Sequence, residues 1–216
     1  MATYLDLVIV PVRFYGYDTI IYLLSAVIGL MIAHSAYKIY KLSEKKQHFY
    51  LSAAFTILGI CFLTISLTSA YTYYRYFVVG DVYPFDPLFG LEDLGYWLYY
   101  IGSLVAYGLL ALMYIPEDIR KKFLPAVFFT PTYFTYLNVV AFFVLAFTAF
   151  RSVSYYLHEK KRSAGLVALS FVLLTAYHAL LPFAVFSKLL YVVAHVSLIL
   201  SFLSLLVMLN LPERKR

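Results

Sequence analysis

The stretch FYLSAAFTILGICFLTISLTSAYTY (49–73) carries no charged side chain and exceeds the roughly 20 residues that a helix needs to cross a 30 Å hydrocarbon core. Four further apolar stretches come close to this length, at 19–40, 94–115, 165–181 and 189–211. Loops that carry charged side chains separate most of them. This alternation predicts an all-α integral membrane protein.

A sixth apolar region, 123–157, is too long for one spanning helix and barely long enough for two. Pro125 and Pro131 disfavour a regular helix in its first part. We therefore expect 123–136 to form a short, tilted or broken crossing, and 138–157 to return across the membrane. The prediction is about seven transmembrane helices, within a range of six to eight.

The composition excludes an ordinary soluble domain. Hydrophobic residues make up 63% of the chain and charged residues 13%, against roughly 25% charged in a typical soluble protein. The 23 tyrosines are too many for the membrane boundaries alone, so some must share hydrogen bonds between helices. Cys61 is the only cysteine, which excludes an intrachain disulfide and predicts a buried, inert thiol.

The basic residues predict the orientation. Most of them fall in four clusters, at 38–46, 120–122, 160–162 and 214–216, whereas the loop at 81–93 is acidic. By the positive-inside rule the clusters are cytoplasmic, which places the N-terminus outside and the C-terminus inside the cell membrane. The net charge of +6 is then a topology signal, so we expect the lipid bilayer as a partner and no nucleic acid.

The two halves of the chain show the same order of features. YIPEDIRKK (114–122) and NLPERKR (210–216) both close a span with a proline, an acidic residue and a basic run. SEKKQ (43–47) and HEKKR (158–162) both precede a small-residue-rich apolar stretch. This order predicts a tandem duplication of a three-helix unit.

The predicted division is a first three-helix repeat with the N-terminal segment at 1–122, a linking segment at 123–136 and a second repeat at 137–216. Both repeats keep their basic residues on one side, so they are parallel and each needs an even number of crossings. Such a three-plus-one-plus-three topology resembles that of the sugar-exporting SWEET family and of seven-helix receptors. The chain has neither the Pro-Gln dipeptide of those exporters nor a lysine midway along its last span for a retinal Schiff base, so no family is assigned.

His178 and His195 are the most suggestive polar pair. They flank one external turn and both lie roughly 9 to 11 Å below the outer surface at 1.5 Å rise per residue. Two neutral imidazoles at equal depth can bind haem iron or another metal, which is the cofactor hypothesis for this chain. The default interpretation is that each histidine hydrogen-bonds a tyrosine, a serine or a backbone carbonyl.

Asp18 and Asn138 occupy matching positions at the outer ends of the two leading spans. They are candidates for a polar gate or a substrate pathway, and helix capping is the default interpretation. Arg151 is a third pathway candidate, because it lies about two turns from a basic loop, where it either reaches the lipid headgroups or pairs with an anion inside the bundle.

No phosphate-binding glycine loop, metalloprotease motif, nucleophile elbow or carboxylate pair is present, which favours a non-enzymatic function. Acidic residues are nearly absent from the predicted spans, which counts against a coupled transporter. Three hypotheses follow: a facilitator or channel for a small solute, a sensor or adaptor that signals through a soluble cytoplasmic partner, and a haem- or metal-binding redox protein. A homo-oligomer remains open in each case.

Overall fold

The computed structural model describes residues 15–79, 91–115 and 134–211, and within them it contains helices and no strand. The long helices are α1 (Tyr15–Ser43), α2 (Lys46–Tyr74), α3 (Leu91–Leu112), α5 (Phe134–Glu159), α6 (Arg162–Leu180) and α7 (Lys188–Asn210). A short π-helical turn, η2 (Arg75–Val79), follows α2, and a 3-10 turn, η4 (Leu181–Val185), follows α6.

Among the described residues, six helices are long and apolar enough to cross a membrane. They coincide with the five clear apolar stretches of the sequence and with the second part of the 123–157 region. The seventh expected crossing, at 123–136, falls almost entirely outside the described residues. The start of the first helix differs from the prediction. The predicted span starts at Thr19, whereas α1 begins at Tyr15 and therefore includes Asp18.

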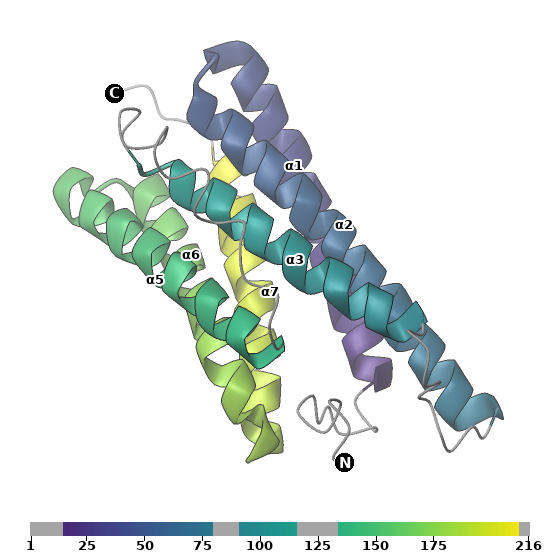
Figure 1. Ribbon diagram of the computed structural model, residues 1–216. Coiled ribbons are helices and arrows are strands. Elements are labelled where there is room, and N and C mark those ends of the chain that lie inside the picture. Colours follow the sequence, from purple (N-terminus) through teal and green to yellow (C-terminus); the bar gives the residue numbers. More distant parts are fainter. Residues whose placement is uncertain (1–14, 80–90, 116–133, 212–216) are drawn as a thin grey trace.

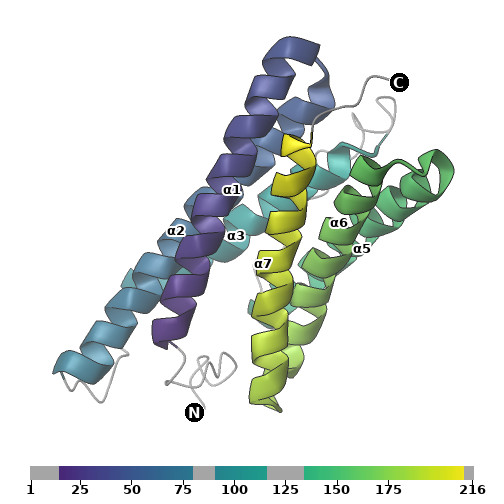
Figure 2. The same cartoon turned by 180° about the vertical axis from the view of Figure 1, so that it is seen from behind.

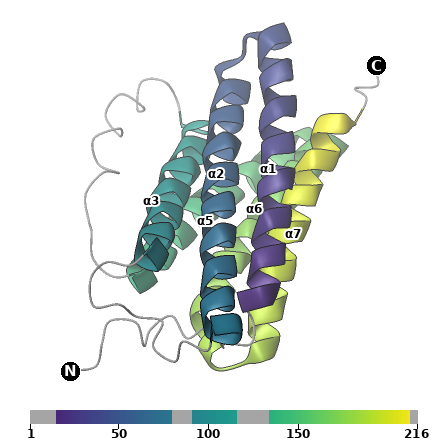
Figure 3. The same ribbon diagram turned by 90° about the vertical axis from the view of Figure 1, so that its right-hand side faces the viewer.

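The helices form two groups of three. In the first unit, α1 packs on α2 and α2 on α3; in the second unit, α5 packs on α6 and α6 on α7. The units meet along two further contacts, α1 with α7 and α3 with α5. Figure 1 shows α3 and α5 in front, Figure 2 shows α1 beside α7 from behind, and Figure 3 shows the same arrangement from the side.

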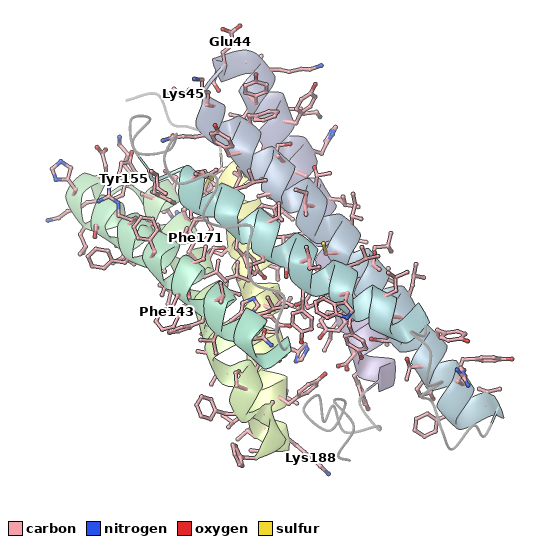
Figure 4. All side chains as sticks on the ribbon, viewed as in Figure 1. Glu44, Lys45, Phe143, Tyr155, Phe171 and Lys188 are labelled. Carbon is pink, nitrogen blue, oxygen red and sulfur yellow. The ribbon has the colours of Figure 1, made fainter. Side chains whose placement is uncertain are left out.

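Corresponding helices of the two units run in the same direction. The α1–α2 turn and the α5–α6 turn lie at one end of the bundle, and α7 also ends there (Figures 1 and 2). We call this the basic end, because Lys45 and Lys160 are exposed in these turns. Lys188 lies at the opposite, or far, end, where α1 and α7 begin (Figure 4). A hydrogen bond from Gln47 Nε2 to the Met113 carbonyl, at 3.5 Å, places the end of α3 at the basic end too.

The two turns at the basic end share one backbone conformation. Glu44 and Lys160 have φ values of 54° and 50°, in the left-handed region that side chains rarely adopt. Each donates its N–H to the carbonyl four residues earlier, at 2.8 Å, and so closes the preceding helix. The next residue, Lys45 or Lys161, is extended and starts the following helix.

Small residues allow the helices of the first unit to pack closely. A Cβ at Gly102 would overlap the Cys61 sulfur, and a Cβ at Gly95 would overlap the Thr68 hydroxyl, so α3 lies close against α2. Gly59 also leaves little space, because a Cβ there would lie 2.8 Å from Leu30 of α1. This close approach is typical of helix packing in membranes, where small residues allow backbones to meet.

Hydrogen bonds between helices of the first unit end on backbone carbonyls, whereas those of the second unit include two side-chain pairs, Ser170 with Ser201 and His178 with Asn138, each 3.1 Å apart. The hydroxyls of Ser52 and Ser66 on α2 bond the α1 carbonyls of Ala33 and Thr19, at 3.0 and 2.8 Å. In the second unit, Ser204 bonds the Leu166 carbonyl at 2.9 Å. Cys61 is buried, as expected, and its thiol lies 3.7 Å from the Leu98 carbonyl.

The outward-facing surface is apolar along the helices. Large hydrophobic side chains are exposed on every long helix, for example Ile20, Leu67, Ile101, Phe143, Leu169 and Leu189. Figure 4 shows Phe143 at the outer side of α5. Water-soluble proteins rarely expose so much contiguous apolar surface.

Candidate functional site

Five hydrogen bonds through tyrosine hydroxyls join the two units across their interface. Each bond links one residue of the first unit to one of the second. The pairs are Asp18–Tyr191, Tyr22–His195, Tyr99–Tyr177, Tyr107–His178 and Tyr100–Asn138. We call these ten side chains the polar layer; nine of them are buried and Tyr22 is partly buried. This is the candidate functional site.

His178 is the centre of one half of the polar layer. Its Nε2 lies 2.8 Å from the Tyr107 hydroxyl of α3, and its Nδ1 lies 3.1 Å from the Asn138 side-chain oxygen of α5. Asn138 also shares a side-chain hydrogen bond with Tyr100 of α3. An imidazole, an amide and two phenols thus meet where α3, α5 and α6 join, and each of them can both donate and accept a hydrogen bond.

His195 is the centre of the other half, where α1 meets α7. Its Nδ1 lies 2.9 Å from the Tyr191 carbonyl, one turn earlier on α7, and therefore donates to it. Its Nε2 then accepts from the Tyr22 hydroxyl of α1, at 3.3 Å. The Tyr191 side chain itself donates to an oxygen of Asp18 on α1.

Tyr99 and Tyr177 connect the two halves. Their hydroxyls are 3.2 Å apart, between α3 and α6. The Tyr177 ring packs edge-on against both histidines, with centroids 4.8 Å from His178 and 5.6 Å from His195. The layer is therefore continuous from the α1–α7 contact to the α3–α5 contact.

An apolar, aromatic region lies beside the polar layer, towards the basic end. The Phe202 ring of α7 reaches across to the first unit and packs edge-on against Phe55 and Phe62 of α2, with centroids 5.2 and 5.6 Å away. Phe171 of α6 packs in the same way against Tyr114 at the end of α3. The interface between the units is thus hydrogen-bonded towards the far end and closed by phenyl rings towards the basic end.

The structure separates some of the predicted site residues. Asp18 and Asn138 bond different partners, at the α1–α7 contact and beside α3 respectively, and not each other. Neither bond is a helix cap: both side chains are buried against another helix. Arg151 is exposed on α5, outside the polar layer, in a position from which it can reach lipid headgroups.

The histidines have no free ring nitrogen in this arrangement. A metal or haem iron at His178 would displace Tyr107 or Asn138, and one at His195 would displace Tyr22 or the Tyr191 carbonyl. Among the described residues, no group of three His, Cys, Asp or Glu side chains could hold a metal ion. The residues therefore do not fit a metal or haem without rearrangement.

Sequence reasoning missed the tyrosines that complete the layer. Tyr99, Tyr107, Tyr177 and Tyr191 lie within apolar stretches, where hydropathy does not distinguish a tyrosine in lipid from one between helices. The general expectation that some tyrosines bond across helices is confirmed. Two sequence signals could have pointed to these tyrosines. Tyr177 is adjacent to His178, and Tyr191 lies four residues, or one helical turn, before His195.

Comparison with known proteins adds no family: no family model, curated protein or solved structure matches this chain. The site must therefore be interpreted from its own geometry.

Proposed function

We propose that this chain is an integral membrane facilitator for small, neutral, polar solutes, in which the solute passes between the two three-helix units. The observation that carries the proposal is the polar layer. Its hydrogen bonds join side chain to side chain across the interface between the units, so a solute with hydroxyl or amide groups can replace them one for one.

The contrast with the packing inside each unit supports a moving interface. Serine-to-backbone bonds and close glycine contacts hold the first unit, and Ser204 makes a similar backbone bond in the second; a solute cannot replace these contacts without separating two helices. Rocking of two such rigid units about a central site is a common way to give alternating access. The phenyl rings around Phe202 then close the basic end while the polar layer faces the far end.

A parallel repeat fits this mechanism and is part of the proposal. Three features support it: corresponding helices run in the same direction (Figure 1), the contacts of α1 with α7 and α3 with α5 correspond, and the turns at Glu44 and Lys160 share one conformation. The exposed lysines favour a cytoplasmic basic end, with the start of α1 outside, in a cell membrane.

Solute flux into liposomes tests the proposal. Protein reconstituted in liposomes is mixed rapidly with hyperosmotic glycerol, urea or glucose, and re-swelling is followed by light scattering. We expect at least one of these solutes to enter faster than in protein-free liposomes, and Tyr107→Phe to slow its entry. Folded protein that passes none of the three would contradict the facilitator and favour the sensor or adaptor.

A further inference from the structure

Asp18 is a carboxyl group buried inside a helix that is apolar enough to span a membrane. Its side chain is only 2% exposed, and it lies in the first turn of α1 at the contact with α7. Its hydrogen-bond partner is the Tyr191 hydroxyl, which belongs to the other unit. Ionisable residues at such positions are costly, and they mark functional sites more often than structural ones.

The groups around Asp18 on α1 and α7 are neutral or weakly basic. Tyr191 contacts it directly, Tyr22 lies one turn further along α1, and His195 lies one turn beyond Tyr191. Tyr191 also lies near Tyr96 and Tyr177, on α3 and α6. His195 donates its Nδ1 proton to a carbonyl and accepts at Nε2, so it is neutral in this arrangement.

The second helix that packs on α1 contributes no described cation to Asp18. Tyr73 of α2 lies near this end of α1, with its ring against Gly16. Arg75, just after α2, lies over the Tyr71 ring, 5.9 Å from its centroid. Lys188, at the start of α7, is exposed. Among the described residues, Asp18 therefore has a phenol donor but no ion-pair partner.

A carboxylate that is buried between two helices loses its hydration. Without a nearby cation, no ion pair offsets the free energy lost with that hydration. The same group facing water is stable as an anion. Because Asp18 is covered by α7 of the other unit, its exposure to water depends on whether the two units are closed or apart at this end.

We propose that Asp18 binds a proton from water each time the two units close at the far end and releases it as they part, so that the movement is linked to pH. This inference rests on the proposed function. It adds the proton as a ligand of the same interface and assigns the site to Asp18 and its donor Tyr191. Protonation then favours the closed interface, and rising pH favours separation.

Infrared spectroscopy of the reconstituted protein tests the proton site. We expect the C=O stretch of a buried, protonated carboxyl group to be present in the wild type and to disappear as pH rises. Asp18→Asn should abolish this band. Glu159→Gln, which removes a carboxyl group that is paired with Lys161 at 2.6 Å at the basic end, should leave it unchanged. A wild type without the band, or an Asp18→Asn variant that keeps it, would overturn the proton site.

Spin-label distances test the link to movement without any transported solute. Labels at Ile20→Cys on α1 and Leu189→Cys on α7, in a Cys61→Ala background, report the separation of the units at the far end; both native side chains are exposed. We expect the separated population to rise with pH by up to tenfold per pH unit for one linked proton. Asp18→Asn should remove this dependence, while Asp18→Glu, which keeps the carboxyl group, should retain it.

The outcomes separate this inference from the facilitator itself. If distances do not change with pH, or change equally in Asp18→Asn, the proton link is wrong even where glycerol, urea or glucose passes. If the band and the distance change both depend on Asp18 but none of these solutes passes, the proton link stands and the facilitator is wrong.

Discussion

The contacts inside the two units and the contacts between them are built from different residues. Inside the first unit, glycine, serine and cysteine let the helices approach closely, and the serine hydroxyls bond backbone carbonyls. The second unit has one such bond, from Ser204, and two side-chain pairs, Ser170–Ser201 and Asn138–His178. Between the units, tyrosine hydroxyls bond to histidine, aspartate or another tyrosine, so these bonds join side chain to side chain. Backbone partners are fixed, whereas side-chain partners can rotate away, which is why we propose that the interface between the units is adjustable.

The largest expected effect comes from breaking a close contact inside a unit. Gly102→Val places two methyl groups where the Cys61 sulfur lies, and such overpacking costs about 1–3 kcal/mol. We expect a lower yield of folded protein and a lower melting temperature in detergent. Ile101→Val, at the neighbouring and exposed position, is the control. Equal melting temperatures for the two variants would contradict close α2–α3 packing.

A matched pair of hydroxyl deletions sharpens the comparison. Tyr107→Phe removes a bond between the units and Ser204→Ala removes one within the second unit. Each should lower stability by about 0.6 kcal/mol, the average for such bonds in membranes, and by no more than about 1.7 kcal/mol. Solute entry into liposomes should fall severalfold only for Tyr107→Phe. A similar loss of flux in Ser204→Ala would mean that the polar layer has no special role.

A smaller, favourable effect is expected at the turn between α5 and α6. Lys160 holds a positive φ that glycine adopts without strain, so Lys160→Gly should stabilise the protein by up to about 1 kcal/mol. A modest rise in melting temperature would support this. Lys161→Gly, at the extended next residue, should not raise it.

The smallest effect is expected from metals. Because every ring nitrogen of His178 and His195 has a partner, neither zinc nor a chelator should shift the melting temperature. The same protein should show no Soret band in its visible spectrum. A shift or a band that is lost in His178→Ala or His195→Ala would rank the redox hypothesis above the other two.

The sequence predicted the six long apolar helices of the described residues, because apolar length determines which segments can cross a bilayer; the seventh expected span, at 123–136, lies almost entirely outside those residues. It placed Asp18 outside the first span, since helix ends are poorly marked in sequence and the residues before Thr19 are mixed in character. As a result helix capping was the default interpretation of Asp18 and a pathway role the alternative, whereas among the described residues its carboxyl group lies at the interface between the units.

The partners within the site could not be predicted, because hydropathy gives the depth of a residue and not its rotation about the helix axis. His178 and His195 share a depth, but each is turned towards a tyrosine of the other unit. Arg151 shows the same limitation. Its position along the span was compatible with the interior of the bundle, but it lies on a face of α5 where its side chain is exposed.

Spin-label distances at the far end test most directly whether the two units are rigid bodies with an adjustable interface. In the Cys61→Ala background, one pair of spin labels spans the units (Ile20→Cys with Leu189→Cys) and a second lies within the first unit (Ile20→Cys with Leu67→Cys). Rigid units with an adjustable interface predict a narrow distribution for the second pair and a broad or two-peaked one for the first, in liposomes. Equally narrow distributions for both pairs would contradict the account.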